Sequence, residues 1–319
     1  MLKNETKFSN NGFLFSGHVS DQQALIKKAS ADNPKEFIFV RATSSTVLKT
    51  ARQAHKLKLV KPILVGEEEV IEKESSLIGW RLKNIEIIPA KDEEDAISCA
   101  VNRYKLGNIS GFIKGNIHTD IFMGGLVKRE AEIRAGRRLV HVFVMLPPDG
   151  GEPLLISDAA INIKPDINTR VESALLMARM LRKMGCAQPK VAILSATESI
   201  LPAMTSSGEA DEIANLATQR DPYADFVGPL SFDLAISPKA TAEKGIVNKV
   251  AGKANALVVP DIVSGNVLFK SLVWCAGGLA AGLVLGGAVP IVLTSRSDPA
   301  EARLAAIALA SLTGDFSSN

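Results

Sequence analysis

The sequence is poor in cysteine, has no basic block and contains no glycine-rich cofactor fingerprint. Its three cysteines, Cys99, Cys186 and Cys275, lie far apart and without the spacing of a metal site. We therefore expect free thiols in a reducing compartment, and no local motif supports a cysteine nucleophile. The net charge of +3 is spread along the chain, so no nucleic-acid surface is expected. Without a dinucleotide or Walker fingerprint, a nicotinamide or ATP enzyme is disfavoured.

The sequence also lacks an uninterrupted membrane-spanning segment. Residues 272–293 carry no charge and are long enough to cross a bilayer, but several glycines and Pro290 interrupt them. A helix, a turn and a buried strand are the better interpretation of this segment. The polar residues 1–7 do not resemble a secretory signal, so we expect a cytoplasmic protein without membrane contact.

Strand patterns and helical periodicity alternate along the chain. We expect strands at residues 37–40, 62–66, 85–88, 111–113, 139–146, 154–156, 190–195, 256–259 and 290–293. We expect helices at residues 22–29, 44–57, 93–106, 119–129, 168–184, 211–219, 240–250, 265–274 and 298–312. This alternation is typical of an α/β protein whose parallel strands are covered by helices on both faces.

The length of the chain and one loop predict two domains. A chain of 319 residues exceeds one ordinary hydrophobic core. Residues 147–153, with the sequence PPDGGEP, form the clearest interruption of the pattern. We expect a domain boundary close to this loop.

Residues 290–301 predict an anion-binding elbow between a strand and a helix. The helix would begin at residues 298–301, whose sequence DPAE has the order of a capping box with proline at the first helical position. The elbow itself is Thr294, Ser295 and Arg296, which would face unpaired N–H groups at the helix start. An arginine fork there suits phosphate. An ordinary turn with a solvent-facing arginine is the alternative.

Other polar residues follow predicted strands, at the carboxyl ends where α/β proteins bind ligands. They are Lys114, Asp158, Asn162 and Asp261, and a group drawn from both halves of the chain suits an interdomain cleft. Each has a structural alternative, because Asp158 can cap a turn, Asn162 can satisfy a loop carbonyl and Asp261 can cap a helix. His118 lies in such a loop and is a candidate base, although the sequence shows no carboxylate placed to orient it.

Six short motifs occur in order along the chain. They are KGNIHT at 114–119, SDAAIN at 157–162, GPLSFD at 228–233, VPDIVSGNVLFK at 259–270, GGLAAG at 277–282 and TSR at 294–296. Together they resemble the phosphate acetyltransferase and phosphate butyryltransferase family, and the butyryltransferase-like branch more closely. The resemblance covers the chain from about Phe37 to its end.

The resemblance implies a two-domain α/β fold of the isocitrate/isopropylmalate dehydrogenase type, with parallel or mixed sheets and a central cleft. Residues 1–148 and 288–319 would form domain I, and residues 149–287 an inserted domain II that dimerises. The implied reaction is acyl-CoA + orthophosphate ⇌ acyl phosphate + CoA, with short acyl groups. Transfer would be direct, in a ternary complex, with no metal and no cofactor apart from the two substrates. A homodimer or larger homo-oligomer is expected.

Residue by residue, the catalytic Ser–Arg pair of the family falls on Ser295 and Arg296. Arg296 would hold the phosphoryl oxygens, and Ser295 would hold the thiol or the developing thiolate. The matching motifs supply the expected substrate contacts, which are Lys114, His118, Asp158, Asn162, Asp261, Asn266 and Thr294.

The chain departs from the long acetyltransferases at two positions. The aspartate proposed there as the base corresponds to Ala302, and the arginine after the His–Thr pair is replaced within residues 122–125. Arg103, Lys114 and Arg134 are open candidates to replace that positive charge. Two other functions therefore stay open, namely a non-catalytic protein that binds CoA or acyl phosphate, and another phosphate-handling enzyme of the same fold.

Overall fold

The computed structural model describes residues 22–134, 138–148, 150–294 and 298–313. Their contacts divide the chain into two compact units. One contains Val140–Ala280, and the other contains Gln22–Leu139 together with the residues from Ala281 onward. The boundaries expected from the sequence were near residues 148 and 288. Strands β5 (Val140–Leu146) and β10 (Leu279–Leu285) lie between the expected boundaries and those of the two units.

The unit that contains Gln22–Leu139 is called the first unit below. Its helices are α1 (Gln22–Ala29), α2 (Ser45–Lys56), α3 (Glu68–Leu77), α4 (Glu93–Lys105), α5 (Thr119–Val127) and α11 (Ala300–Thr313), with a 3-10 turn at Arg129–Ala131. Its strands are β1 (Glu36–Val40), β2 (Lys61–Gly66), β3 (Glu86–Pro89), β4 (Ile109–Lys114), β11 (Ile291–Val292) and most of β10 (Leu279–Leu285).

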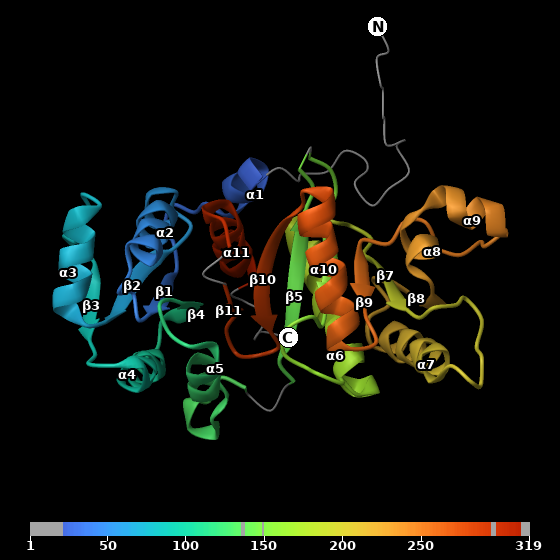
Figure 1. The fold of residues 1–319 in the computed structure, drawn as a ribbon, viewed down its shortest axis with the longest axis horizontal. Coiled ribbons are helices and arrows are strands. Elements are labelled where there is room, and N and C mark those ends of the chain that lie inside the picture. The colour runs from blue at the N-terminus through green and yellow to red at the C-terminus, as the bar shows by residue number, and fades with distance from the viewer. Residues whose placement is uncertain (1–21, 135–137, 149, 295–297, 314–319) are drawn as a thin grey trace, which may run out of the picture. The chain divides into compact units, whose positions relative to one another are not determined.

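The strands of the first unit follow the order β3-β2-β1-β4-β11-β10. The first five are parallel, and β10 is antiparallel to β11. Figure 1 shows how the chain end returns, with α11 (red) beside α2 (blue). Helix α11 is apolar and almost wholly buried, and because β11 pairs with β4 it completes the sheet begun by the start of the chain.

The unit that contains Val140–Ala280 is called the second unit. Its strands are β5 (Val140–Leu146), β6 (Leu154–Ser157), β7 (Lys190–Leu194), β8 (Asp225–Leu230) and β9 (Ala256–Val258), in the order β5-β6-β9-β7-β8. Its helices are α6 (Ile167–Met184), α7 (Thr205–Arg220), α8 (Phe232–Ile236), α9 (Pro238–Lys244) and α10 (Ile262–Ala276). The pairs β6–β9, β9–β7 and β7–β8 are parallel, and β5–β6 is antiparallel.

The expected alternation of strands and helices is confirmed, and the sheets are mixed. The helix expected at 240–250 is wrong in extent, because α9 ends at Lys244 where Gly245 takes a left-handed conformation with φ 66°. Strand β8 escaped the sequence analysis because Pro229 lies inside it. The strand is the last in its sheet order, and an edge strand tolerates proline.

The charge-free segment 272–293 holds more structure than the sequence analysis expected. It contains the end of α10, then β10, then a turn with Gly286 at φ 93°, then β11. The sequence predicted a helix, a turn and one buried strand in this segment. The structure has the end of a helix followed by two antiparallel strands. None of the helices in the described part of the chain is both long and apolar enough to cross a membrane.

Candidate functional site

A pocket of about 240 Å³ opens in the first unit at the carboxyl ends of β1, β4 and β11. Its polar lining comes from Ser44, Thr46, Thr50, Lys114, Asn116, Thr294 and Arg303. Its apolar lining comes from Phe39, Val47, Ile113, Val292 and Ile307, with Gly115 beside them. The pocket thus joins the loop after β4, the start of α2 and the residue after β11.

Strand register explains why these segments meet. Lys114 pairs with Val40 across β4 and β1, and Ile113 pairs with Val292 across β4 and β11, so the three carboxyl ends lie side by side. The loop after β4 crosses β1 at Gly115, where an added Cβ would lie 2.4 Å from the Val40 carbonyl oxygen. Only glycine allows this close approach.

The start of α2 supplies hydrogen-bond donors to the pocket. Ser44 is the N-cap of this helix and accepts a hydrogen bond from the Val47 backbone N–H. Ser44 and Thr46 both line the pocket. The first N–H groups of a helix lack partners and carry partial positive charge, so an anion is stabilised at this position.

Two cationic side chains complete the pocket. Lys114 is buried, with 7% of its surface exposed. The guanidinium of Arg303 donates to the Thr50 hydroxyl oxygen at 3.1 Å and to the Asp298 carbonyl oxygen, so it is held by α2 and by the residues before α11. Cations, hydroxyls and a helix N-terminus together suit a phosphate-like oxyanion.

Arg303 is a residue that the sequence analysis missed. One turn into a predicted helix it looks like an ordinary surface arginine. The sequence did contain one signal for Arg303. It and Glu301 are the only charged residues of α11, whose other residues are mostly apolar. Among the open candidates for a substitute cation, Lys114 lies at the pocket. Arg103 does not, because it pairs with Glu36 and Glu86, the first residues of β1 and β3 at the opposite strand ends.

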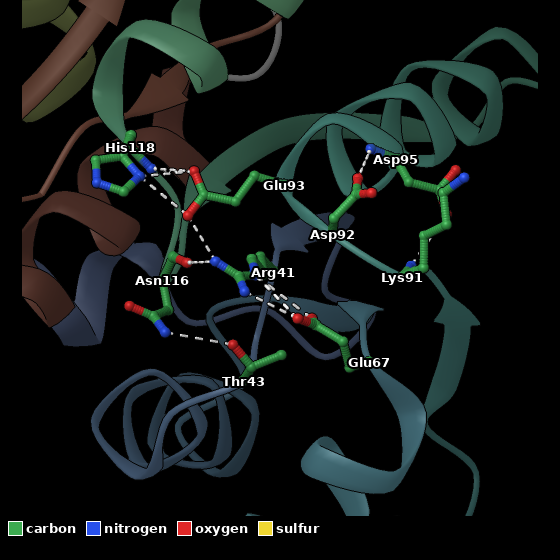
Figure 2. A network of polar contacts seen from close by, with 9 residues as sticks. All are labelled: Arg41, Thr43, Glu67, Lys91, Asp92, Glu93, Asp95, Asn116 and His118. Atoms are coloured by element: carbon green, nitrogen blue, oxygen red, sulfur yellow. Dashed lines mark hydrogen bonds and ion pairs between the residues drawn. The ribbon is translucent and has the colours of Figure 1, made fainter.

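A second polar cluster lies beside the pocket and is drawn in Figure 2. Arg41, directly after β1, donates to Glu67 at 2.9 Å and to Glu93 at 2.6 Å. The same guanidinium donates to the Asn116 carbonyl oxygen at 3.1 Å. The hydrogen bond to Glu67 is the largest cause that raises the pKa of Arg41, and the charge of Glu93 adds to it.

Glu93 connects Arg41 to His118. Its carboxylate accepts the backbone N–H of His118 at 2.9 Å and lies 2.8 Å from the His118 ring Nδ1. Partial burial raises the pKa of Glu93, but the hydrogen bonds from His118 and the nearby cations outweigh it, so that pKa is lowered. The carboxylate is therefore ionised at neutral pH, and it is the orienting group for His118 that the sequence did not reveal.

The structure divides the expected site residues between the two units. Thr294 and Lys114 line the pocket, and His118 lies two residues beyond Asn116, which also lines it. Ser295 and Arg296, the expected catalytic pair, lie outside the described residues.

In the second unit, the expected site residues make structural contacts. Asp158 is buried and accepts four hydrogen bonds, from the backbone N–H groups of His141, Ala160 and Ile161 and from the Asn162 side chain. Asp261 is the N-cap of α10, where it accepts from the Ser264 backbone N–H at 2.8 Å. Asn266 donates to the Ala159 carbonyl oxygen at 3.3 Å.

The four expected site residues of the second unit nevertheless lie close to one another. They are Asp158, Asn162, Asp261 and Asn266. Gly265 of α10 packs so closely on the loop after β6 that an added Cβ would lie 2.6 Å from the Asp158 carbonyl oxygen. The structural alternatives weighed for Asp158 and Asp261 are thus the contacts that these residues make. Within the described residues no three His, Cys, Asp or Glu side chains are grouped so as to hold a metal ion.

Comparisons with known proteins bear on the whole chain. The family model described as Phosphate acetyl/butaryl transferase matches residues 22–114 and 91–311. A phosphate acetyltransferase of Rhizobium meliloti is 37% identical, over 92% of this chain and 93% of that protein. A phosphate butyryltransferase of Clostridium acetobutylicum (strain ATCC 824) is 30% identical, over 90% of this chain and 96% of that protein.

Solved structures share the fold. The crystal structure of a branched-chain phosphotransacylase from Enterococcus faecalis V583 has a TM-score of 0.76 and 28% identity, over 88% of this chain and 99% of that chain. A 4-hydroxythreonine-4-phosphate dehydrogenase from Burkholderia phymatum has a TM-score of 0.54 and 14% identity, over 88% of this chain and 98% of that chain. The second likeness concerns the fold alone, and it agrees with the expected dehydrogenase-like architecture.

Proposed function

The chain belongs to the Phosphate acetyl/butaryl transferase family, and from this premise we propose that it transfers a short acyl group between coenzyme A and orthophosphate. The reaction is acyl-CoA + orthophosphate ⇌ acyl phosphate + CoA, with an acyl group between acetyl and butyryl. Coenzyme A and phosphate act as substrates, and the transfer proceeds directly in a ternary complex without a metal or a cofactor.

The observation that carries the proposal is the pocket at the carboxyl ends of β1, β4 and β11. Lys114 and Arg303 provide positive charge, and the start of α2 provides N–H groups and hydroxyls for an oxyanion. Its volume of about 240 Å³ is below the range of roughly 300–1,000 Å³ that drug-sized ligands occupy. The pocket therefore suits phosphate and the adjoining acyl group rather than the whole of coenzyme A.

The proposed catalytic pair adjoins this pocket in the sequence. Ser295 and Arg296 directly follow Thr294, which lines the pocket. In the proposal Arg296 binds the phosphoryl oxygens and Ser295 donates to the sulfur of coenzyme A. Both roles strengthen as negative charge develops in the transition state, which is the condition for lowering a barrier.

The proposal includes a cytoplasmic homodimer. Helix α10 exposes an apolar stripe, because Val263, Val267 and Trp274 are 65%, 59% and 85% exposed at helical spacing. An exposed stripe of this kind is typical of a protein interface. Sedimentation of the purified protein tests this part, and a monomer at micromolar concentration would contradict it.

A second candidate function is supported by Ala302. This residue occupies the position of the proposed base of the long acetyltransferases, and it is buried with 3% exposure. A protein that binds coenzyme A or acyl phosphate without turning it over would need no base.

Release of free thiol from acyl-CoA distinguishes the candidates. Acetyl-CoA, propionyl-CoA and butyryl-CoA are incubated with the protein, with and without phosphate, before and after dialysis against EDTA. We expect thiol release that requires phosphate and survives the dialysis. Binding without release would support the second candidate. Release without phosphate would indicate a hydrolase, and activity restored by one divalent ion would contradict transfer without a metal.

A further inference from the structure

His118 is held in a single orientation by Glu93. Both carboxylate oxygens lie within hydrogen-bond distance of the ring Nδ1, at 2.8 and 3.0 Å. The backbone N–H of His118 adds a third contact at 2.9 Å. Figure 2 shows the Nδ1 edge of the ring turned to Glu93 and the other nitrogen turned away. Because Nδ1 donates to the carboxylate, Nε2 of the neutral ring carries the free lone pair.

Glu93 is itself fixed, so the ring cannot turn freely. Arg41 binds Glu93 at 2.6 Å on one side of its guanidinium and Glu67 at 2.9 Å on the other. Arg41 also donates to the Asn116 carbonyl oxygen, which ties the cluster to the loop after β4. Two carboxylates, those of Glu67 and Glu93, thus share the one guanidinium of Arg41.

The cluster separates a buried support from an exposed reactive atom. The Glu93 side chain is only 13% exposed, whereas that of His118 is 66% exposed. A shielded carboxylate behind an accessible imidazole is the arrangement that orients a histidine base in acyl-transfer enzymes.

The loop after β4 places this histidine beside the pocket. Lys114, Gly115 and Asn116 line the pocket, and His118 follows two residues later as the N-cap of α5. Asn116 belongs to both groups, since it lines the pocket and binds Arg41. The loop after β4 therefore links the pocket to the His118 cluster.

The proposed reaction needs a proton acceptor. The position that holds the proposed base in the long acetyltransferases cannot provide one in this chain. A free thiol has a pKa of about 8.5, so a base accelerates its attack at neutral pH. Ala302, at the position of the proposed aspartate base, is buried and apolar.

We infer that His118, positioned by Glu93, is the base that accepts the proton of the coenzyme A thiol, an inference that rests on the proposed acyltransferase function. Nε2 takes the S–H proton while sulfur attacks the carbonyl carbon of the acyl phosphate. The C–S bond forms, and the bond from that carbon to the phosphate oxygen breaks, its electron pair leaving with phosphate. In the reverse direction the imidazolium returns the proton to the departing thiolate.

The first variant is His118→Asn. Its amide N–H can replace the Nδ1 donor to Glu93, and asparagine is a favoured N-cap for α5, so folding is preserved while the base is removed. We expect turnover from acetyl phosphate and coenzyme A to fall about 10²–10⁴-fold, with both KM values nearly unchanged. His55→Asn, at an exposed position in the last turn of α2, is the matched control and should keep full turnover.

Two further variants separate a chemical role from a structural one. In His118→Gly, added imidazole should restore part of the turnover, an effect that a merely structural histidine would not show. Glu93→Gln removes the orienting charge, so turnover should fall while both KM values stay nearly the same, and Glu93→Asp should recover part of the loss.

The outcomes distinguish this inference from the proposed function. If wild-type protein catalyses phosphate-dependent transfer while His118→Asn keeps near-full turnover, His118 is not the base and the proposed function stands. A loss confined to KM in His118→Asn would likewise overturn the inference. If the wild-type protein itself catalyses no transfer, it is the proposed function that fails.

Discussion

The two units place polar residues at the same topological position and use them in different ways. In the first unit, Lys114 and Thr294 follow parallel strands and line an open pocket. In the second unit, Asp158 and Asp261 also follow parallel strands, but both accept hydrogen bonds from backbone N–H groups beside them. The sequence pattern is the same in the two units, and the neighbouring backbone decides the outcome.

The comparison shows what makes a polar strand end available to a ligand. Asp158 satisfies four donors around it, which leaves little capacity for a substrate. His118 uses one ring nitrogen on Glu93, and its side chain is mostly exposed. We therefore expect substitutions in the second unit to lower stability, and substitutions in the first unit to lower turnover or substrate affinity.

The largest effect is expected for Asp158→Asn. One carboxylate oxygen becomes an N–H₂ group that faces donors, so two of the four hydrogen bonds are lost. At about 1–3 kcal/mol for each unsatisfied buried donor, the free energy of unfolding should fall by roughly 4 kcal/mol. Urea unfolding measures this, with Asn162→Ala as the milder control. An unchanged midpoint together with lost turnover would make Asp158 a substrate contact and remove the contrast between the units.

The next largest effect is expected for Arg296→Ala, which should lower turnover about 10²–10³-fold, as for the loss of one oxyanion donor. Arg296→Lys keeps the charge but loses the planar fork, so it should not be benign. Ser295→Ala should cost somewhat less. Steady-state kinetics at saturating acyl-CoA and phosphate test these variants, and near-full turnover of a folded Arg296→Ala protein would remove the proposed mechanism.

A third effect concerns pH and belongs to the second unit. Burial of His141 lowers its pKa from 6.5 to about 4, although the charge of Asp158 acts in the opposite direction. The unfolded chain therefore binds the proton more tightly, and stability is lost as pH falls from about 6.5 toward 4. Between pH 6.5 and 4.5 this amounts to about 2–3 kcal/mol.

His141→Phe tests this prediction, since a phenyl ring can keep the packing against Phe143, whose ring centroid lies 4.4 Å away. Urea midpoints at several pH values should fall less steeply for the variant than for the wild-type protein. Parallel curves would mean that another group carries the acid sensitivity.

The smallest effect is expected for Arg303→Lys in the first unit. Lysine cannot keep the hydrogen bond to Thr50 and reach a ligand with a planar fork. The KM for phosphate should rise about tenfold, which corresponds to about 1.4 kcal/mol. Arg52→Lys, on the exposed face of α2, is the control. An unchanged KM would show that Arg303 is only structural, and Lys114 and Arg296 would then remain as the proposed phosphate-binding cations.

The sequence by itself determined the class of fold and most of its elements. The helix at Gln22–Ala29 has the expected bounds, and β1, α2 and α4 lie within a residue or so of theirs. These elements are set by local periodicity, because a buried strand or an amphipathic helix shows its pattern within its own residues. The ordered motifs likewise identified the family, since they need no knowledge of contacts.

The tertiary structure decided which polar residues are available for chemistry. The sequence offered no carboxylate for His118, because Glu93 lies on another helix and Arg41 follows another strand, and only the parallel order β2-β1-β4 brings the three together. It also left Asp158 open as a ligand contact, because its donors include His141, which is 17 positions away in the chain. Hydrogen bonds between distant segments depend on the packing of the sheet, which local periodicity does not specify.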